Sequence, residues 1–256
     1  MRREAGNGKS AITPAVGIGS AAEGERFIPR TGALWFLRRA FAVCANDAAL
    51  ELRRRVAVAS VLFFSAACLA LVSFAIGPFG LPADARETVC SALLWVVLFF
   101  SAATGLPRAF VREEESGTAL ALRTVAPAAA VVAGKAFFNF LLFAAIAAVT
   151  VPAFSLLLGW QIAAPGALAA VLVLAGAGLS IVSTFLSALV ARASQKSVLF
   201  VLVSFPLVAP LLLSAIVATV AASRGEVPWT ALRVLVAYDG AAACGAYLLA
   251  SAAWDE

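Results

Sequence analysis

Six long apolar runs dominate the chain from residue 56 onwards. Each run has few or no formal charges and is close to the ~20 residues that an α-helix needs to cross a roughly 30 Å hydrocarbon core. Because lipid offers the backbone no hydrogen-bond partner, any non-helical backbone should lie between the runs. The sequence therefore predicts an all-α integral membrane protein with six transmembrane helices, at residues 56–77, 89–106, 135–158, 166–191, 198–221 and 231–253.

The composition also favours a membrane environment. Hydrophobic residues make up 63% of the 256 residues and charged residues 13%, whereas about a quarter of a soluble domain is charged. The net charge of +5 is explained by Lys and Arg in cytoplasmic loops, so we expect no nucleic-acid partner. The chain has no His and only one Met, Met1. A Ser–His catalytic pair, a His-based zinc site and His or Met haem ligation are therefore excluded for this chain, and the four Cys residues lack metal-binding spacing.

The residues before the first apolar run divide into two segments. Residues 1–30 mix Gly, Ala, Arg and Glu without periodicity, so we expect a disordered cytoplasmic tail. Residues 31–55 place an apolar stripe opposite an arc that contains arginines, which predicts an amphipathic helix on the membrane surface. A helix packed against a partner protein is the alternative. The stripe consists of Leu34, Leu37, Phe41, Cys44 and Ala48.

The first apolar run is too long for a signal-peptide core of roughly 7–15 residues, so we expect it to remain in the mature protein.

The distribution of Lys and Arg predicts the orientation. With a cytoplasmic N terminus, sixteen of the nineteen Lys and Arg residues lie on the inner side. The other three are Arg86, Arg224 and Arg233. Because Lys and Arg concentrate in cytoplasmic connections, we expect both termini and the connection 107–134 to be cytoplasmic, within a permease domain at residues 56–256.

The inner connection 107–134 combines charged and apolar residues. An acidic run follows Arg112 and precedes a Gly-centred break between two short helical pieces. Apolar residues among alternating charges suit docking to a cytosolic protein, and an ordinary solvated loop is the alternative. The candidate coupling residues are Phe110, Arg112, Glu113, Glu114, Glu115, Gly117 and Thr118.

Three residues interrupt the apolar runs themselves. Pro206 and Pro210 lie four apart in the fifth run, and each removes a backbone hydrogen bond and kinks the helix, either as a gate or through simple packing. Asp239 lies inside the sixth run, where a carboxylate is costly and often functional. If that span begins near Gly240, Asp239 is interfacial instead. Small residues of the fourth run predict close helix packing: Gly176, Gly178, Ser180, Ser183 and Ser187.

Together these features resemble the haem exporter protein B (CcmB) family. The resemblance covers roughly residues 35–250 and rests on the six spans and on three segments. These are Leu94-Trp95-Val96-Val97, then Phe110 with Glu113-Glu114-Glu115-Ser116-Gly117-Thr118, and Phe205-Pro206-Leu207-Val208-Ala209-Pro210-Leu211-Leu212-Leu213-Ser214. Two positions depart from the family pattern. Ala119-Leu120-Ala121 stands where an acidic residue is frequent, and Ser214 stands where Gly is frequent.

The resemblance implies the membrane subunit of an ABC-type complex in bacterial cytochrome c maturation. A separate cytoplasmic ATPase would bind and hydrolyse ATP, since this chain has no G-x-x-x-x-G-K-[ST] loop. The subunit would couple hydrolysis to haem delivery or to release of a haem-loaded chaperone. Its partners would be that ATPase, a haem-handling membrane protein, the chaperone and the lipid bilayer, and it could pair with a second copy of itself. No cofactor is expected on this chain, haem being handled by partners, and the expected location is the bacterial inner membrane.

Three other functions fit parts of the pattern. An ABC-2 type exporter permease for a lipid, glycan or drug would have the same architecture. An intramembrane enzyme would need a paired acid and base, but the spans offer only Asp239 with scattered Ser and Thr. An assembly scaffold without transport is the third. Neighbouring genes for an ATPase and a haem chaperone, or co-purification of the subunits, would separate these alternatives from the first.

Overall fold

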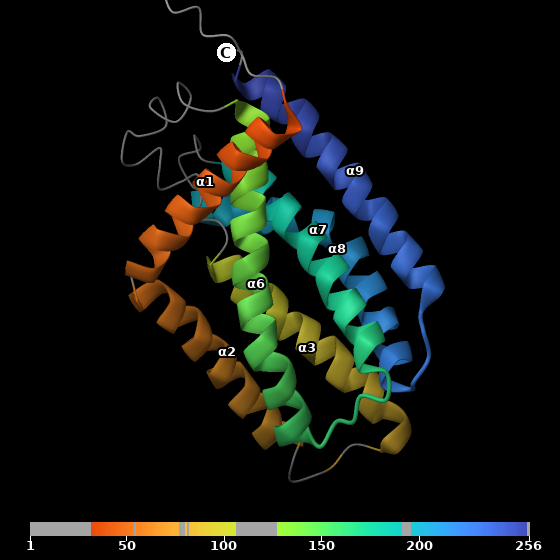
Figure 1. Ribbon diagram of the computed structural model, residues 1–256. Helices are drawn as coiled ribbons and strands as arrows, with labels where there is room; N and C mark the ends of the chain where they lie inside the picture. The colour runs from red at the N-terminus through yellow and green to blue at the C-terminus, as the bar shows by residue number, and fades with distance from the viewer. Residues whose placement is uncertain are drawn as a thin grey trace, which may run out of the picture. The chain divides into compact units, whose positions relative to one another are not determined.

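The structure is a computed structural model that describes residues 32–53, 55–76, 80, 82–105, 127–190 and 196–254. Within these residues all regular structure is α-helical, in seven helices (Figure 1). This confirms the predicted all-α class. The helices are α1 Ala33–Arg53, α2 Arg55–Ile76, α3 Ala83–Gly105, α6 Ala128–Leu158, α7 Pro165–Val190, α8 Lys196–Ser223 and α9 Trp229–Trp254.

Five of the described helices are long and apolar enough to cross a membrane. Their candidate spans are Ala85–Ala103, Ala129–Leu158, Pro165–Ala188, Leu202–Ser223 and Trp229–Leu248, which correspond to the second to sixth predicted runs. The helix α2 corresponds to the first run, and its apolar part among the described residues is the shorter stretch Val61–Ile76. The chain is therefore a multi-pass membrane protein, and the number of six spans stays a prediction.

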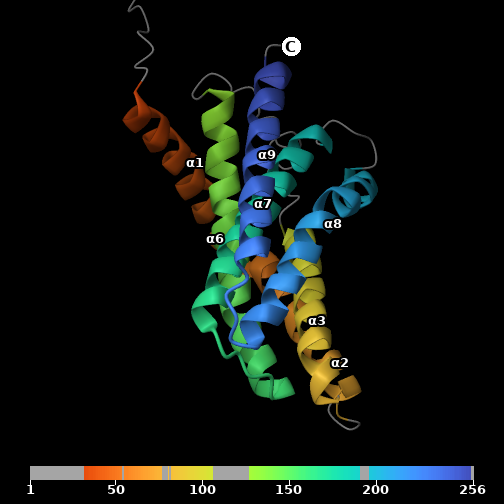
Figure 2. The same ribbon diagram turned by 90° about the vertical axis from the view of Figure 1, so that its right-hand side faces the viewer.

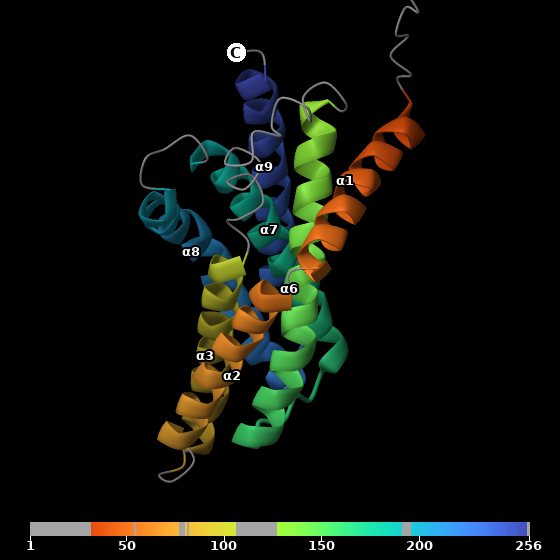
Figure 3. The same ribbon diagram turned by 90° about the vertical axis from the view of Figure 1, so that its left-hand side faces the viewer.

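The helices α2, α3, α6, α7, α8 and α9 run alternately in opposite directions (Figures 1 and 2). The helix α7 is central, because it packs against α6, α8 and α9. The helix α3 completes the bundle by packing against α2, α6 and α8. The C-terminal end of α9 lies at the same end of this bundle as the first turns of α6 (Figures 1 and 3). Under the predicted orientation, that end is the cytoplasmic one.

The ends of α6 follow from its local sequence. Pro127 precedes it in an extended conformation, as expected for a residue that cannot donate a backbone hydrogen bond. Gly159 ends it in the left-handed region, with φ 59°, and its N–H bonds to the carbonyl of Ser155. The helix begins earlier than the predicted run, so residues 128–134, expected in the inner connection, are its first turns.

Some of the buried polar side chains form hydrogen bonds from one helix to another. Trp95 on α3 donates from Nε1 to Thr219 Oγ1 on α8 at 2.9 Å, and its ring stacks near that of Phe143 on α6. Asn139 on α6 donates to Thr184 Oγ1 on α7 at 2.7 Å. Hydrogen bonds between helices commonly stabilise helix association in lipid, because burial of apolar surface contributes little to association there. They hold α3, α6, α7 and α8 in register.

The helix α1 packs obliquely against the first half of α6 (Figure 3). Gly134 permits this approach, because a Cβ there would meet the carbonyl oxygen of Ala40. Next to it, Lys135 Nζ lies 3.1 Å from Asp47 Oδ2, and the lysine side chain is only 1% exposed. Leu37 and Phe41 of the predicted apolar stripe are 60% and 67% exposed. These two residues are therefore left uncovered by the bundle, whereas Cys44 of the same stripe is 3% exposed, so the predicted stripe is divided between the surface and the bundle.

Candidate functional site

The predicted coupling residues lie outside the described residues. All seven, from Phe110 to Thr118, belong to residues 106–126, between the end of α3 at Gly105 and Pro127 before α6. Their role stays a prediction. The other candidate residues, Pro206, Pro210 and Asp239, are all described, and the structure places them near one another.

The two prolines lie inside one continuous helix, α8. Each lacks an N–H, so the carbonyl four residues earlier loses its helical partner. Ser214 Oγ donates to the carbonyl of Pro210 at 2.9 Å. The hydroxyl of Tyr238, on α9, donates to the carbonyl of Leu207 at 2.7 Å. These two hydroxyls bond to carbonyls in the turns that contain the prolines, and not to the carbonyls of Leu202 and Pro206, which lose their helical donors.

Asp239 follows Tyr238 and lies inside the last span. The helix α9 begins at Trp229 and its candidate span is Trp229–Leu248, so Asp239 lies within the candidate span and not at its start. A Cβ built on Gly178 of α7 would overlap Asp239 Oδ1, and it would lie 3.0 Å from a methyl of Leu211 on α8. Oδ1 is buried and has no hydrogen-bond partner among the described residues.

These contacts define a junction of three helices, which we call the Asp239 junction. It comprises Gly178 on α7, Leu207 and Leu211 on α8, and Tyr238 and Asp239 on α9. The sequence flagged the prolines and Asp239 separately. It gave no sign that Tyr238 bonds to the proline-containing segment. Gly178 was identified only as one of several small packing residues. Its close contact with the Asp239 carboxylate depends on how α7 and α9 are rotated relative to each other.

The junction as defined contains a single carboxylate. Its Oδ1 has no hydrogen-bond partner in the described part of the chain. In that same part, no group of three or more His, Cys, Asp or Glu residues could hold a metal ion. The arrangement instead suits a point at which three helices are fixed in position relative to one another.

An exposed ion pair joins the N-terminal part of α3 to the residue that directly follows the C-terminal end of α8. Arg224 Nε donates to Glu87 Oε2 at 2.5 Å. This hydrogen bond, with the nearby negative charge, raises the pKa of the Arg224 guanidinium above its ordinary value. The pair shows that Arg224 and the first turns of α3 lie at the same end of the bundle, as the predicted orientation requires for two outer segments.

The fold is that of an all-helical, multi-pass membrane protein. The sequence profile of the CcmB protein family matches residues 38–254, which include all the candidate spans. The chain therefore belongs to the CcmB family, and the resemblance seen in the sequence is confirmed. It is a membrane component of the haem-export ABC system of cytochrome c maturation, which operates with other Ccm components. Comparison with curated proteins finds no match.

Proposed function

We propose that this chain couples ATP hydrolysis by a separate cytoplasmic ATPase to haem delivery or to release of a haem-loaded chaperone. The observation that carries the proposal is the family match over residues 38–254 in a chain that has no phosphate-binding G-x-x-x-x-G-K-[ST] loop. ATP must then be bound by another subunit. The chain would act in the bacterial inner membrane, with both termini in the cytoplasm, as the Lys and Arg asymmetry favours.

The inner connection is the proposed docking site for the ATPase. Its acidic run, Glu113 to Glu115, would face a basic patch on the partner, because complementary charge guides and orients such contacts. Phe110 would be covered by the same partner. Gly117 would permit the bend between the two halves of the segment.

Movement at this connection would pass first to α6, which begins directly after it. The buried ion pair between Lys135 and Asp47 joins α1 to α6, so the two helices would move together. The helix α6 packs along α7, which carries Gly178 and so contacts Asp239. A continuous series of contacts thus leads to the proline-containing α8, whose interrupted hydrogen bonding makes it the easiest span to bend.

Haem would be held by the partner proteins. The chain contains no His, and Met1 is its single Met, so the usual axial ligands must come from elsewhere. No cofactor is proposed on this chain. The membrane subunit would contribute by changing the positions of its helices as the ATPase passes from one nucleotide state to another.

Co-purification tests this proposal. The tagged chain is expressed with the ATPase, the haem-handling membrane protein and the haem chaperone, and the complex is reconstituted in lipid. We expect the ATPase and the haem-handling protein to elute with the chain, and ATP addition to release the chaperone. If the ATPase co-elutes while neither haem-handling partner does, and hydrolysis responds to a lipid or drug instead, the chain is an exporter permease and the proposal is wrong.

A further inference from the structure

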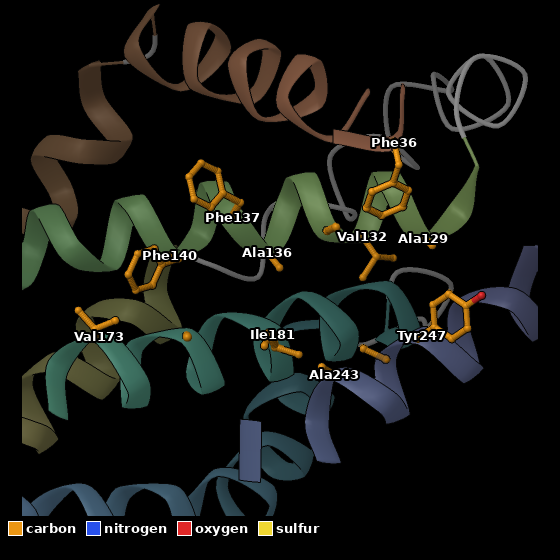
Figure 4. Close-up of a pocket in the computed structure, with 13 residues that line it drawn as sticks. Phe36, Ala129, Val132, Ala136, Phe137, Phe140, Val173, Ile181, Ala243 and Tyr247 are labelled. Atoms are coloured by element: carbon orange, nitrogen blue, oxygen red, sulfur yellow. The ribbon is translucent and has the colours of Figure 1, made fainter. Parts of the chain in front are cut away.

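An apolar groove runs along one side of the bundle (Figure 4). It encloses about 540 Å³ between α6, α7 and α9, and α1 contributes Phe36. Its floor and walls are rich in alanine. The rings of Phe36 and Tyr247 lie at one end, and Phe140 with Val173 lies at the other (Figure 4). The Tyr247 hydroxyl belongs to the one lining side chain with a polar group.

The groove opens onto the surface that faces lipid. Phe137, Val173 and Tyr247 line it and are also largely exposed, Tyr247 by 63%. All three lie on helices that can cross the membrane. The groove is therefore continuous with the contact between protein and bilayer.

The depth of the groove matches a single leaflet. Along α6 it extends from Ala129 to Phe140, which is about 16 Å at 1.5 Å per residue. One leaflet contributes roughly half of a 30 Å hydrocarbon core. On α7 the groove begins at Val173, near the middle of the span Pro165–Ala188. On α9 it ends at Tyr247, at the end of the span Trp229–Leu248. Tyrosine favours that interfacial level.

The volume of the groove is too small for a helix. A cylinder ~10 Å wide and about 16 Å long takes up roughly 1,250 Å³, whereas the groove holds about 540 Å³. A helix from a second copy would therefore lie over the groove and leave it unfilled. A flexible apolar chain fits both this volume and the alanine lining.

We propose that the groove binds one acyl chain of a phospholipid from the leaflet at the α1 end of the bundle. The chain lies against Ala136 and Ala177, and its terminal methyl lies near Val173. The glycerol backbone lies at the level of Tyr247. Phe36 closes the inner end, so the lipid also fixes α1 against α6. Arg38 and Arg39, on the next turn of α1, bring positive charge to the headgroup level. This site does not depend on the proposed function.

Photo-crosslinking of the reconstituted chain tests the site. Vesicles of phosphatidylethanolamine and phosphatidylglycerol carry a fraction of phosphatidylglycerol with a diazirine on its acyl chain. The protein is extracted in detergent, stripped of free lipid, illuminated and digested for mass spectrometry. We expect the retained label on the stretch of α7 between Val173 and Ile181. The substitution Ala177→Phe or Ala136→Phe should lower the retained label by about tenfold, because the phenyl ring occupies the apolar surface that the acyl chain would contact.

The matched control is Ala66→Phe, on an exposed position of α2 away from the groove, which should keep the wild-type label. Equal label on α2 and α7 after detergent extraction overturns the proposal. So does full retention of label in both groove variants, provided that each elutes as a single species like the wild type. Bis-maleimide crosslinking through the exposed Cys244, with the other cysteines replaced by Ser, tests a second copy. If a crosslinked dimer forms and the groove carries no lipid label, the lipid proposal is also overturned.

Discussion

Asp239 Oδ1 lies in the space that a side chain at Gly178 would occupy. The carboxylate of α9 thus touches the backbone of α7 in the middle of the bundle, and glycine is what makes room for it. A Cβ at Gly178 would also lie 3.0 Å from a methyl of Leu211 on α8, and Tyr238, next to Asp239, donates to the carbonyl of Leu207 on the same helix. The account therefore predicts that the effects of substitution at positions 178 and 239 depend on each other.

Replacing Gly178→Ala should destabilise the bundle by about 1–2 kcal/mol, because the added methyl forces Asp239 and Leu211 to shift in a packed interior. Most of this penalty should vanish in an Asp239→Ala background, where the space is free. Thermal unfolding of the four proteins in detergent measures the coupling. Gly245→Ala is the control, since nothing lies within 4 Å of its added Cβ. An equal penalty for Gly178→Ala in both backgrounds would show that the contact is unimportant.

Asp239→Asn separates charge from shape at the junction. The amide keeps the size of the side chain and removes the need to bury a charge without a partner, so stability should be unchanged or higher. If the carboxylate contributes to coupling, chaperone release should fall while the ATPase still binds. The measurements are unfolding temperature, co-purification and ATP-dependent release. Wild-type release in the Asn variant would limit Asp239 to a packing role.

Breaking the ion pair between Lys135 and Asp47 should be costly. In Asp47→Ala the buried lysine loses its ion pair with Asp47, which should reduce the free energy of unfolding by about 3 kcal/mol. The double variant Asp47→Ala with Lys135→Met should recover much of that loss, since no buried ammonium remains. Glu87→Ala is the matched control, because it breaks the exposed pair with Arg224 and should cost less than about 1 kcal/mol. Similar losses in Asp47→Ala and Glu87→Ala would contradict the buried-pair account.

Labelling of introduced cysteines tests the orientation. In a variant without native cysteines, Glu226→Cys should react with a membrane-impermeant maleimide added to intact cells. Glu226 is exposed between α8 and α9, on the predicted outer side. Glu114→Cys should react only after the membrane is opened, since the inner connection is predicted to be cytoplasmic. Labelling of position 114 in intact cells would reverse the topology.

The sequence predicted the helical class and the candidate spans well, because hydrophobic run length is a direct consequence of bilayer thickness. It placed Lys135 at the cytoplasmic end of the third predicted span, whereas the lysine is buried inside α6. A single charge near the end of an apolar run looks like a boundary, and Asp47, its partner, lies 88 positions earlier. Hydropathy along the chain cannot detect a pairing at that separation.

The junction shows the same limitation at finer scale. Asp239 was recognised as unusual because a carboxylate in an apolar run is rare. Its contact with Gly178 depends on how α7 and α9 are rotated about their axes, which packing between helices decides. In α1, the predicted apolar stripe leaves Leu37 and Phe41 uncovered but also contains Cys44, which is buried in the bundle, and its contact with the membrane surface stays a prediction. The side that faces α6 was set instead by Gly134 and the ion pair, which periodicity does not reveal.

The central claim, that this membrane subunit works through a separate ATPase docked on the inner connection, is tested most directly by a pull-down from solubilised membranes. Glu113, Glu114 and Glu115 are replaced together by Lys, and the amount of ATPase retained per tagged chain is compared with the wild type. The account predicts a loss of about tenfold or more, since attraction to a basic surface becomes repulsion, while the level of the membrane subunit stays normal. Retention of the ATPase at wild-type affinity by a normally produced triple variant would contradict it.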